Sequence, residues 1–212
     1  MKKPLLIFGA SHGTGLEVAR LARARGYPVN GFARSISPML TRLGVPQHCG
    51  DALEWEQPLA FCRDCPDAAA AVCTIGGGPV GVSADFAGVV NVVDAVRAAG
   101  ISRFVLLSSL GAGESRAHAS APLLAAIGPI LEEKTRGEEY LRASGLAYTI
   151  LRAGGLNNAP AGEGGVLVER PDAHGRIARE ELAVLILDAL EREDTVGRVY
   201  SAVAKRFVKE DR

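Results

Sequence analysis

Three glycines near the amino terminus, with polar residues between them, form the strongest candidate for a ligand-binding loop. After the apolar run Leu5–Phe8 the chain reads GASHGTG from Gly9 to Gly15, and apolar residues at helical spacing follow. A glycine-rich turn from a strand into a helix presents unpaired main-chain N–H groups to an anion. We therefore predict that this loop holds the diphosphate of a dinucleotide, with an ordinary glycine-rich turn as the alternative. The predicted contacts are Gly9, Ser11, His12, Gly13, Thr14 and Gly15.

The residues after the second predicted strand indicate which nucleotide this loop would serve. The strand over 29–33 is followed by Arg34 and Ser35, with no carboxylate. An NAD site places an Asp or Glu here to accept a hydrogen bond from the ribose 2′-hydroxyl, whereas a guanidinium pairs with the 2′-phosphate of NADP. One charge-assisted hydrogen bond contributes about 1.5–3 kcal/mol. Arg34 and Ser35 therefore predict NADP (NADPH) as the cofactor, the alternative being that Arg34 is an ordinary surface arginine.

Composition and charge exclude several classes of protein. The chain has 212 residues, is 48% hydrophobic and carries 24 Lys+Arg against 24 Asp+Glu. This balance lacks the basic excess of a nucleic-acid binder or a membrane-surface protein. Every apolar run is shorter than the roughly 18 residues of a membrane-spanning helix, and no targeting segment is recognised before the first strand. We expect a cytoplasmic protein with a small-molecule substrate and with neither a nucleic-acid nor a membrane partner.

The cysteines and histidines form no recognisable metal or disulfide framework. Cys62 and Cys65 have CxxC spacing, but no second pair completes a tetrahedral zinc site. The pair also falls late in a predicted helix, whereas a redox motif would lie at a helix start. The four histidines are widely scattered. We predict incidental, reduced cysteines and no bound metal.

Short apolar runs alternate with helical stretches along most of the chain. Strands that are apolar throughout indicate a parallel sheet covered on both faces, because a solvent-facing side would require alternating polar residues. The expected strands are 5–8, 29–33, 45–49, 70–75, 104–107, 147–151 and 198–202. The expected helices are 16–22, 38–43, 54–63, 85–99, 129–143 and 180–193.

These elements predict one α/β domain over residues 1–212, a Rossmann-type doubly wound parallel sheet with a short C-terminal elaboration on the substrate side. The glycine-rich stretch 154–178 is expected to be a substrate-side loop, and residues 110–130 a second loop that could act as a lid. The helix over 85–99 could pack internally or against a second copy, so a homodimer stays open. A solvated helix face is expected to carry Glu132, Glu133, Glu138 and Glu139.

With these features the sequence resembles the short-chain dehydrogenase/reductase superfamily, in particular its atypical NmrA-like and biliverdin/flavin-reductase-like branch. The resemblance extends over nearly the whole chain. It is carried by the stretches 9–15, 50–52, 76–77, 103–109, 144–152 and 175–179 and by Lys134. The cofactor contacts that it implies are Asp51 and Ala52 at the adenine, Ile75, Gly76 and Gly77 at the adenosine ribose, Ser108 beside the nicotinamide half, Lys134 at the nicotinamide ribose, and Ala153, Gly154, Gly155 and Leu156 over the nicotinamide.

One departure from the resemblance concerns the general acid. Related enzymes with the full catalytic set carry Tyr four residues before the Lys, whereas this chain has Ile130, which cannot transfer a proton. We therefore expect an NADP(H)-dependent oxidoreductase, a reductase whose small planar redox-active or carbonyl substrate, such as a flavin or quinone, needs little acid from the protein. Ser109, near the substrate, and Lys134 are its candidate catalytic residues. The alternatives are a non-catalytic NADP(H)-binding regulatory or redox-sensing protein and, third, a protein like the sugar-nucleotide epimerases.

Overall fold

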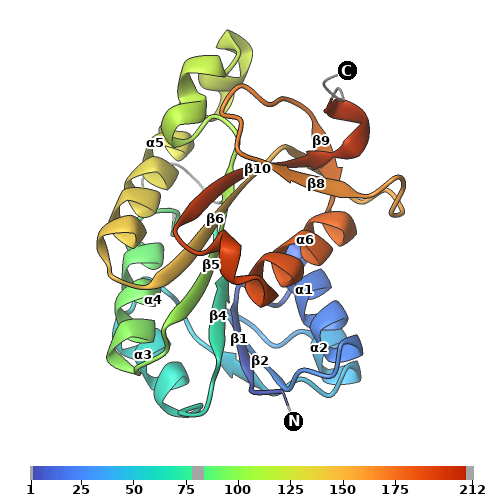
Figure 1. The fold of residues 1–212 in the computed structure, drawn as a ribbon. Coiled ribbons are helices and arrows are strands. Elements are labelled where there is room, and N and C mark those ends of the chain that lie inside the picture. Colours follow the sequence, from blue (N-terminus) through green and yellow to red (C-terminus); the bar gives the residue numbers. More distant parts are fainter. Residues whose placement is uncertain (1, 78–83, 209–212) are drawn as a thin grey trace.

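The computed structural model describes residues 2–77 and 84–208, and its centre is an eight-stranded sheet (Figure 1). The strands lie in the order β3-β2-β1-β4-β5-β6-β10-β8, and only the last pair is antiparallel. Because the strand order reverses between β1 and β4, the predicted doubly wound Rossmann-type sheet is confirmed. The strands are β1 (Leu5–Phe8), β2 (Val29–Ala33), β3 (Gln47–Cys49), β4 (Ala70–Cys73), β5 (Arg103–Ser109), β6 (Ala147–Ala153), β8 (Gly165–Val168) and β10 (Arg198–Ala204).

Helices cover both faces of the sheet (Figure 1). One face carries α1 (Gly13–Ala24), α2 (Pro38–Arg42) and α6 (Arg179–Glu191), and the other carries α3 (Glu56–Arg63), α4 (Ala87–Ala98) and α5 (Ala121–Ala143). Short 3-10 helices lie at η1 (Gly113–His118), η2 (Glu193–Thr195) and η3 (Lys205–Phe207). Helix α4 packs between α3 and α5. Its apolar face is therefore used inside the chain, and a homodimer stays a prediction.

Strand β1 shows why both faces need a helical cover. Leu5 and Ile7 belong to the core that α1 and α6 complete, whereas Leu6 and Phe8 belong to the core on the side of α3 and α4. All four side chains are buried. Successive side chains of a strand point to opposite faces, so their burial requires helices on both sides. This packing fixes the carboxyl end of β1, where the glycine loop begins.

Helix α5 begins at Ala121, so the prediction of a helix start at Pro129 was wrong. Ser120 caps the helix by accepting a hydrogen bond from Leu123 N (3.4 Å), and Pro122 occupies the first turn, where its missing N–H is not needed. Pro129 lies within the helix at an exposed position. Because a proline usually marks the start or a break of a helix, the predicted start of this helix was placed at Pro129. The predicted loop 110–130 therefore contains η1 and the first turns of α5.

The stretch 154–178, predicted as a loop, contains strand β8 together with β7 (Gly155–Asn157) and β9 (Arg176–Ala178). β7 and β9 form a separate parallel pair, and β8 extends the main sheet beside β10. The glycines of the stretch 154–178 allow neighbouring main-chain and side-chain atoms to pack closely against it. A Cβ on Gly154 would lie 2.5 Å from the carbonyl oxygen of Gly175, and one on Gly165 would lie 2.7 Å from Leu185. Partners distant in sequence stabilise these strands, so the local pattern gave no signal.

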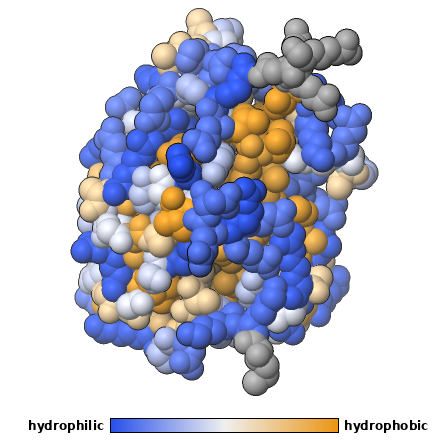
Figure 2. All heavy atoms as spheres, in the orientation of Figure 1, coloured by the Kyte–Doolittle hydropathy of each residue, from blue (hydrophilic) through white to orange (hydrophobic). Residues whose placement is uncertain are grey.

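The surface of the C-terminal elaboration includes large apolar side chains. On the face seen in Figure 2, hydrophilic residues predominate and apolar residues gather in the upper part. Leu156 in β7 is 39% exposed and Phe207 in η3 is 43% exposed. Within the described part of the chain, no helix combines the length and apolar character needed to cross a membrane.

Candidate functional site

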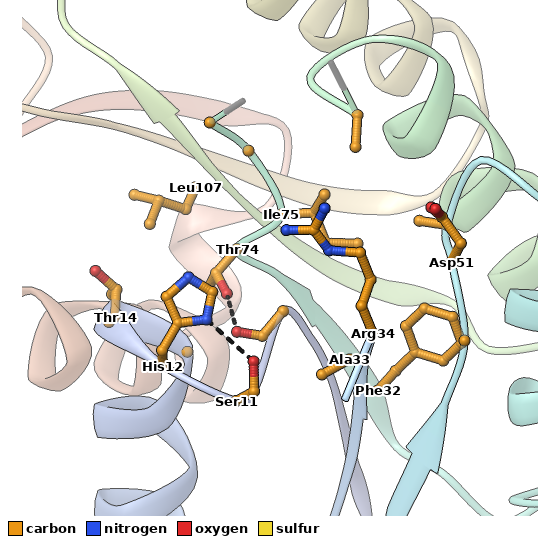
Figure 3. A pocket seen from close by; sticks show the side chains of 18 of the residues that line it. Ser11, His12, Thr14, Phe32, Ala33, Arg34, Asp51, Thr74, Ile75 and Leu107 are labelled. Carbon is orange, nitrogen blue, oxygen red and sulfur yellow. Dashed lines mark hydrogen bonds between the residues drawn. The ribbon is translucent and has the colours of Figure 1, made fainter. Parts of the chain in front are cut away.

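A pocket of about 470 Å³ opens at the carboxyl ends of β1, β2, β3 and β4 (Figure 3). It lies at the reversal of strand order between β1 and β4, where open α/β sheets bind their ligands. Residues from four strand ends thus converge on one cavity. The predicted cofactor contacts that line it are Gly9, Ser11, His12, Gly13, Thr14, Gly15, Arg34, Asp51, Ala52, Ile75, Gly76, Gly77 and Leu156.

The glycine loop has a backbone that other residues could not adopt without strain. Gly9 and Gly13 have φ angles of +83° and +58°, in the left-handed region that favours glycine. A Cβ on Gly15 would collide with the carbonyl oxygen of Gly9. The first glycine therefore allows the sharp turn, the second lets the main chain approach a ligand, and the third lets α1 pack against β1. Glycines of dinucleotide-binding loops have these three functions.

The start of α1 offers unused hydrogen-bond donors to an anion. Its N-cap residue, His12, makes no side-chain capping bond, and no acidic residue lies in the first turn. The buried hydroxyl of Thr14 has no hydrogen-bond partner among the described residues, which is rare in folded proteins. A diphosphate would accept hydrogen bonds from this hydroxyl and from the first main-chain N–H groups of the helix. The residues present therefore fit the diphosphate of a dinucleotide.

Arg34 extends from the end of β2 into the space between His12 and Asp51 in the view of Figure 3. Within residues 2–77 and 84–208 it forms no ion pair. Asp51 also lines the pocket, but its carboxylate does not pair with Arg34; it accepts a hydrogen bond from Leu53 N (3.0 Å). Ser35 is exposed and does not line the pocket. The β2 end therefore offers a guanidinium that is not neutralised.

Lys134 lies at the border of the pocket and pairs with Asp85, which was not among the predicted site residues. Its Nζ is 2.6 Å from Oδ1 of the buried Asp85, whose Oδ2 accepts a hydrogen bond from Gly77 N (3.0 Å). A Cβ on Gly76 would lie 2.8 Å from Lys134 Nζ, so the ammonium packs against the pocket-lining backbone. Ile130 is half-buried one turn earlier on α5. Asp85 thus fixes both Lys134 and the main chain at Gly77.

Five side chains beside the ends of β5 and β6 form what we call the β5–β6 charge network: Ser108, Glu114, Glu138, Arg142 and Arg152. Ser108 Oγ donates to Glu138 (2.5 Å), and Arg152 donates to Glu138 through Nε (3.1 Å) and Nη2 (2.6 Å). Arg152 also contacts Glu114, to which Arg142 donates (2.9 Å). The side chains of Glu138 and Arg152 are 2% and 4% exposed. The prediction that Glu138 lies on a solvated helix face was therefore wrong, because its side chain is buried.

Several predicted contacts of the nicotinamide half, and the candidate catalytic Ser109, do not line the pocket. Ser108 is buried in the network, and Ser109 Oγ donates to the carbonyl oxygen of Leu110 (3.0 Å). Ala153 and Gly154 are buried at the end of β6, where Gly154 N donates to Ala202 O (3.0 Å). Gly155 is exposed in β7. The pocket lining includes none of these serine, alanine and glycine residues, but it does include Leu156, which follows Gly155.

Sequence reasoning missed two polar residues of the pocket. Thr74 directly follows β4, and its hydroxyl lies 3.0 Å from the carbonyl oxygen of Phe8 and 3.3 Å from that of Gly9. Its position at a strand end beside the reversal was an available signal. Arg179 begins α6 and belongs to the stretch 175–179 that carried the family resemblance, but that stretch was given no function. Other lining residues that were missed are Phe32, Ala33, Gly50, Leu53, Ala84 and Leu107.

The thiols of the Cys62 and Cys65 pair are weakly acidic. Burial raises the pKa of the Cys62 thiol to about 12 and also raises the pKa of Cys65. Both thiols are therefore protonated near neutral pH, and a protonated thiol is a poor nucleophile and metal ligand. In the described ranges, no group of three or more His, Cys, Asp or Glu side chains could hold a metal ion.

The doubly wound sheet, the glycine loop and the pocket at the strand reversal together define an NAD(P)-binding Rossmann protein. The model of a family described as NAD(P)H-binding matches residues 9–193, and the chain belongs to this family. Membership agrees with the resemblance to atypical short-chain dehydrogenases/reductases in the sequence. It establishes an NAD(P)H site and the setting of an oxidoreductase family.

Similar proteins include reductases. A solved structure of ChuY, named an anaerobillin reductase of Escherichia coli O157:H7, is 32% identical, covers 98% of this chain and 100% of its own, and has a TM-score of 0.88. An uncharacterized chloroplastic protein of Arabidopsis thaliana is 31% identical over 96% of this chain and 77% of its own. Sanguinarine reductase of Eschscholzia californica is 34% identical over 57% of this chain and 45% of its own.

Proposed function

We propose that this protein is an NADPH-dependent reductase of a planar, conjugated or carbonyl substrate such as a flavin, a quinone or a tetrapyrrole. The observation that carries the choice of NADPH is Arg34, which lines the pocket at the end of β2 without an ion-pair partner in the described chain and without a carboxylate beside it on that strand. Reduction is supported by the similarity to ChuY and to sanguinarine reductase.

In this proposal the chain binds and orients, and NADPH, when bound, supplies the hydride. The glycine loop and Thr14 would hold the diphosphate, and Arg34 would hold the 2′-phosphate. Lys134, which Asp85 fixes against Gly76, would orient the nicotinamide ribose. These contacts place the reactive ring, which is the task of the protein in such chemistry.

The proton that completes the reduction would come from water. Ile130 offers no acid at the position where related enzymes have Tyr. The hydroxyl protons of Ser108 and Ser109 are directed to Glu138 and to the Leu110 carbonyl oxygen, respectively. Ser109 could then accept a hydrogen bond from a substrate but not supply its proton. A conjugated substrate suits this site because its reduced anion is delocalised and takes up a solvent proton without a strong acid.

The substrate side of the molecule suits a flat apolar ligand. Leu156 lines the pocket and is exposed, and Phe207 is exposed on η3. A Cβ on Gly175, just before β9, would lie 2.6 Å from the Phe207 ring, so this ring packs close to the β7–β9 pair. An exposed apolar side chain in the lining of a pocket, as Leu156 is, is typical of a ligand-binding surface.

Anaerobic stopped-flow measurement of NADPH oxidation would test the proposal. We expect oxidation with at least one of FMN, a benzoquinone and biliverdin, and a slower reaction with NADH. Replacement Arg34→Gln should reduce the preference for NADPH over NADH by about 10- to 100-fold, because one charge-assisted interaction is lost. NADPH that binds without being oxidised by any of these acceptors would contradict a reductase of this class.

A non-catalytic NADP(H) sensor is the second candidate, and Ile130 in place of the acid favours it. The pairing of Lys134 with Asp85 also fits a lysine with a purely structural function. A sensor would bind NADP and NADPH with different affinities and oxidise nothing. Calorimetric titration with both redox forms, run beside the kinetic assay, separates the two candidates.

A further inference from the structure

We propose that Arg179 binds the cofactor diphosphate and joins the bound dinucleotide to the β7–β9 strand pair. The inference rests on the proposed function, because it requires a dinucleotide in the pocket. It adds a cationic residue from the C-terminal part of the chain to a diphosphate site whose other proposed contacts are in the glycine loop and the first turn of α1. It also assigns the β7–β9 pair a part in cofactor binding.

The position of Arg179 places its charge at the glycine loop. Arg179 is the first residue of α6, and it lines the pocket together with Gly13 and Thr14. A Cβ built on Gly13 would lie 3.6 Å from Arg179 Nε. The guanidinium therefore lies beside the main-chain donors expected to hold a diphosphate. Together they would surround such a group with main-chain, hydroxyl and guanidinium donors.

The charge of Arg179 is not neutralised by the protein. Arg179 forms no ion pair with any described residue. The neighbouring Glu180 pairs instead with Arg20 (2.7 Å), whose other partner is Glu17 (2.8 Å). Arg179 thus places a positive charge against the positive end of the α1 dipole, an arrangement that costs free energy unless an anion lies between them.

An independent observation points to a ligand at the same place. The buried Thr14 Oγ1 has no hydrogen-bond partner within the described ranges. Thr14 lines the pocket on the first turn of α1, between Gly13 and Gly15. A buried hydroxyl without a partner and a cation without a counter-ion are both satisfied by one anionic ligand with several oxygens.

Arg179 also reaches the β7–β9 pair. Its Nη1 donates to Asn158 Oδ1 (2.6 Å), and Asn158 directly follows β7, the strand whose Leu156 lines the pocket. β9 ends at Ala178, immediately before Arg179. A guanidinium carries five N–H donors in a fixed plane, so it can bond Asn158 and a phosphate oxygen at once. A bound diphosphate would therefore stabilise β7 over the pocket.

Binding of four ligands to three variants tests the assignment by calorimetry. The variants are Arg179→Gln, Arg34→Gln and the control Arg63→Gln, which removes an exposed arginine at the end of α3 that does not line the pocket. The ligands are NADPH, NADH, ADP-ribose and 2′-AMP. NADPH, NADH and ADP-ribose contain the diphosphate, whereas NADPH and 2′-AMP contain the 2′-phosphate.

Each arginine should affect only the ligands that carry the phosphate group assigned to it. We expect Arg179→Gln to weaken NADPH, NADH and ADP-ribose by a similar factor, about 10- to 100-fold, and to leave 2′-AMP unchanged. Arg34→Gln should weaken NADPH and 2′-AMP and leave NADH and ADP-ribose unchanged. Arg63→Gln should change none of them. ADP-ribose that binds Arg179→Gln as tightly as the original protein, or equal weakening of all four ligands, would overturn the assignment.

Hydrogen exchange tests the connection to β7. ADP-ribose at saturation should slow amide exchange in residues 155–159 of the original protein. This protection should be lost in Arg179→Gln and in Asn158→Ala, which keeps the arginine but removes its partner. Unchanged protection in both variants would refute the connection. If the original protein binds none of the four ligands, the proposed function itself fails; if Arg34→Gln behaves as expected and Arg179→Gln has no effect, only this inference fails.

Discussion

The two halves of the carboxyl edge of the sheet use charged residues differently. In the pocket at β1–β4, Arg34 and Arg179 have no ion-pair partner among the described residues. In the β5–β6 charge network, Arg152 is buried between Glu138 and Glu114. The same side-chain type is thus unneutralised in one half and fully paired in the other. Unpaired cations at a pocket suit the binding of an anion, whereas paired buried charges fix the architecture.

The difference follows from where free energy would be lost. The Arg34 guanidinium is exposed and therefore solvated, so it has little need of a carboxylate until a ligand displaces its water. A buried guanidinium without a partner would lose several kcal/mol of solvation. The β5–β6 charge network therefore has to be complete in the folded protein, and it leaves little capacity to bind a substrate anion. In the proposed function, substrate binding in that half would depend more on shape and apolar contact.

The largest effect should come from removing one partner of the buried pair. Glu138→Ala leaves Arg152 buried with only the more exposed Glu114, and the free energy of unfolding should fall by about 3–5 kcal/mol. Urea denaturation measures this change in the free energy of unfolding. Glu138→Leu combined with Arg152→Leu removes both charges and should recover much of the loss. A loss below about 1 kcal/mol for Glu138→Ala, the range of a surface ion pair, would remove the contrast between the halves.

The second largest effect should come from a change in the backbone of the pocket. Gly15→Ala places a Cβ against the carbonyl oxygen of Gly9, so α1 must move from β1, at a cost of about 1–3 kcal/mol. We expect NADPH affinity to fall as well, since the phosphate loop moves with α1. Gly128→Ala in α5 is the control, because a Cβ there meets nothing within 4 Å and the residue is helical. It should be neutral or slightly stabilising.

The sequence predicted the pocket half far better than the network half. The glycine loop, Arg34 and Asp51 lie at strand ends, so locating the strands located the site. Leu5–Phe8 was predicted with its observed bounds because an apolar run of four residues between polar segments has few alternatives. Local pattern was sufficient wherever one strand end and its following turn formed the feature.

The β5–β6 charge network was not predictable in this way. Glu138 lies on α5 and Arg152 on β6, and nothing local indicates that the two side chains meet in the core. A helix with several glutamates is more often solvated, which led to the wrong interpretation of Glu138. Asp85 and Arg179 were missed for a related reason, since their partners Lys134 and Asn158 are distant in sequence.

A smaller effect is expected from Ser109, the last residue of β5. Because its hydroxyl donates to the Leu110 carbonyl oxygen, Ser109→Ala should lower kcat/KM by less than about 10-fold, whereas loss of a general acid costs about 10²–10⁴-fold. Steady-state kinetics with the best acceptor checks this. NADPH affinity should stay unchanged. A loss of about 10³-fold with a shifted pH profile would make Ser109 a proton donor and would break the argument for a solvent proton.

The smallest expected effect is a pH dependence at the outer end of the network. Hydrogen bonds from Arg142, with a contribution from Arg152, lower the pKa of Glu114 to about 2 from an ordinary 4.5. A carboxyl with a depressed folded-state pKa stabilises the protein above its unfolded pKa, and this stabilisation is lost as the pH falls from about 4.5 to about 2. The side chain is 56% exposed, so solvent screens the pair and the effect is small. Urea midpoints across this range should fall less steeply for Glu114→Gln than for the original protein. If Glu114→Gln follows the original curve, Glu114 adds nothing to the network, and Glu138 alone balances the buried Arg152.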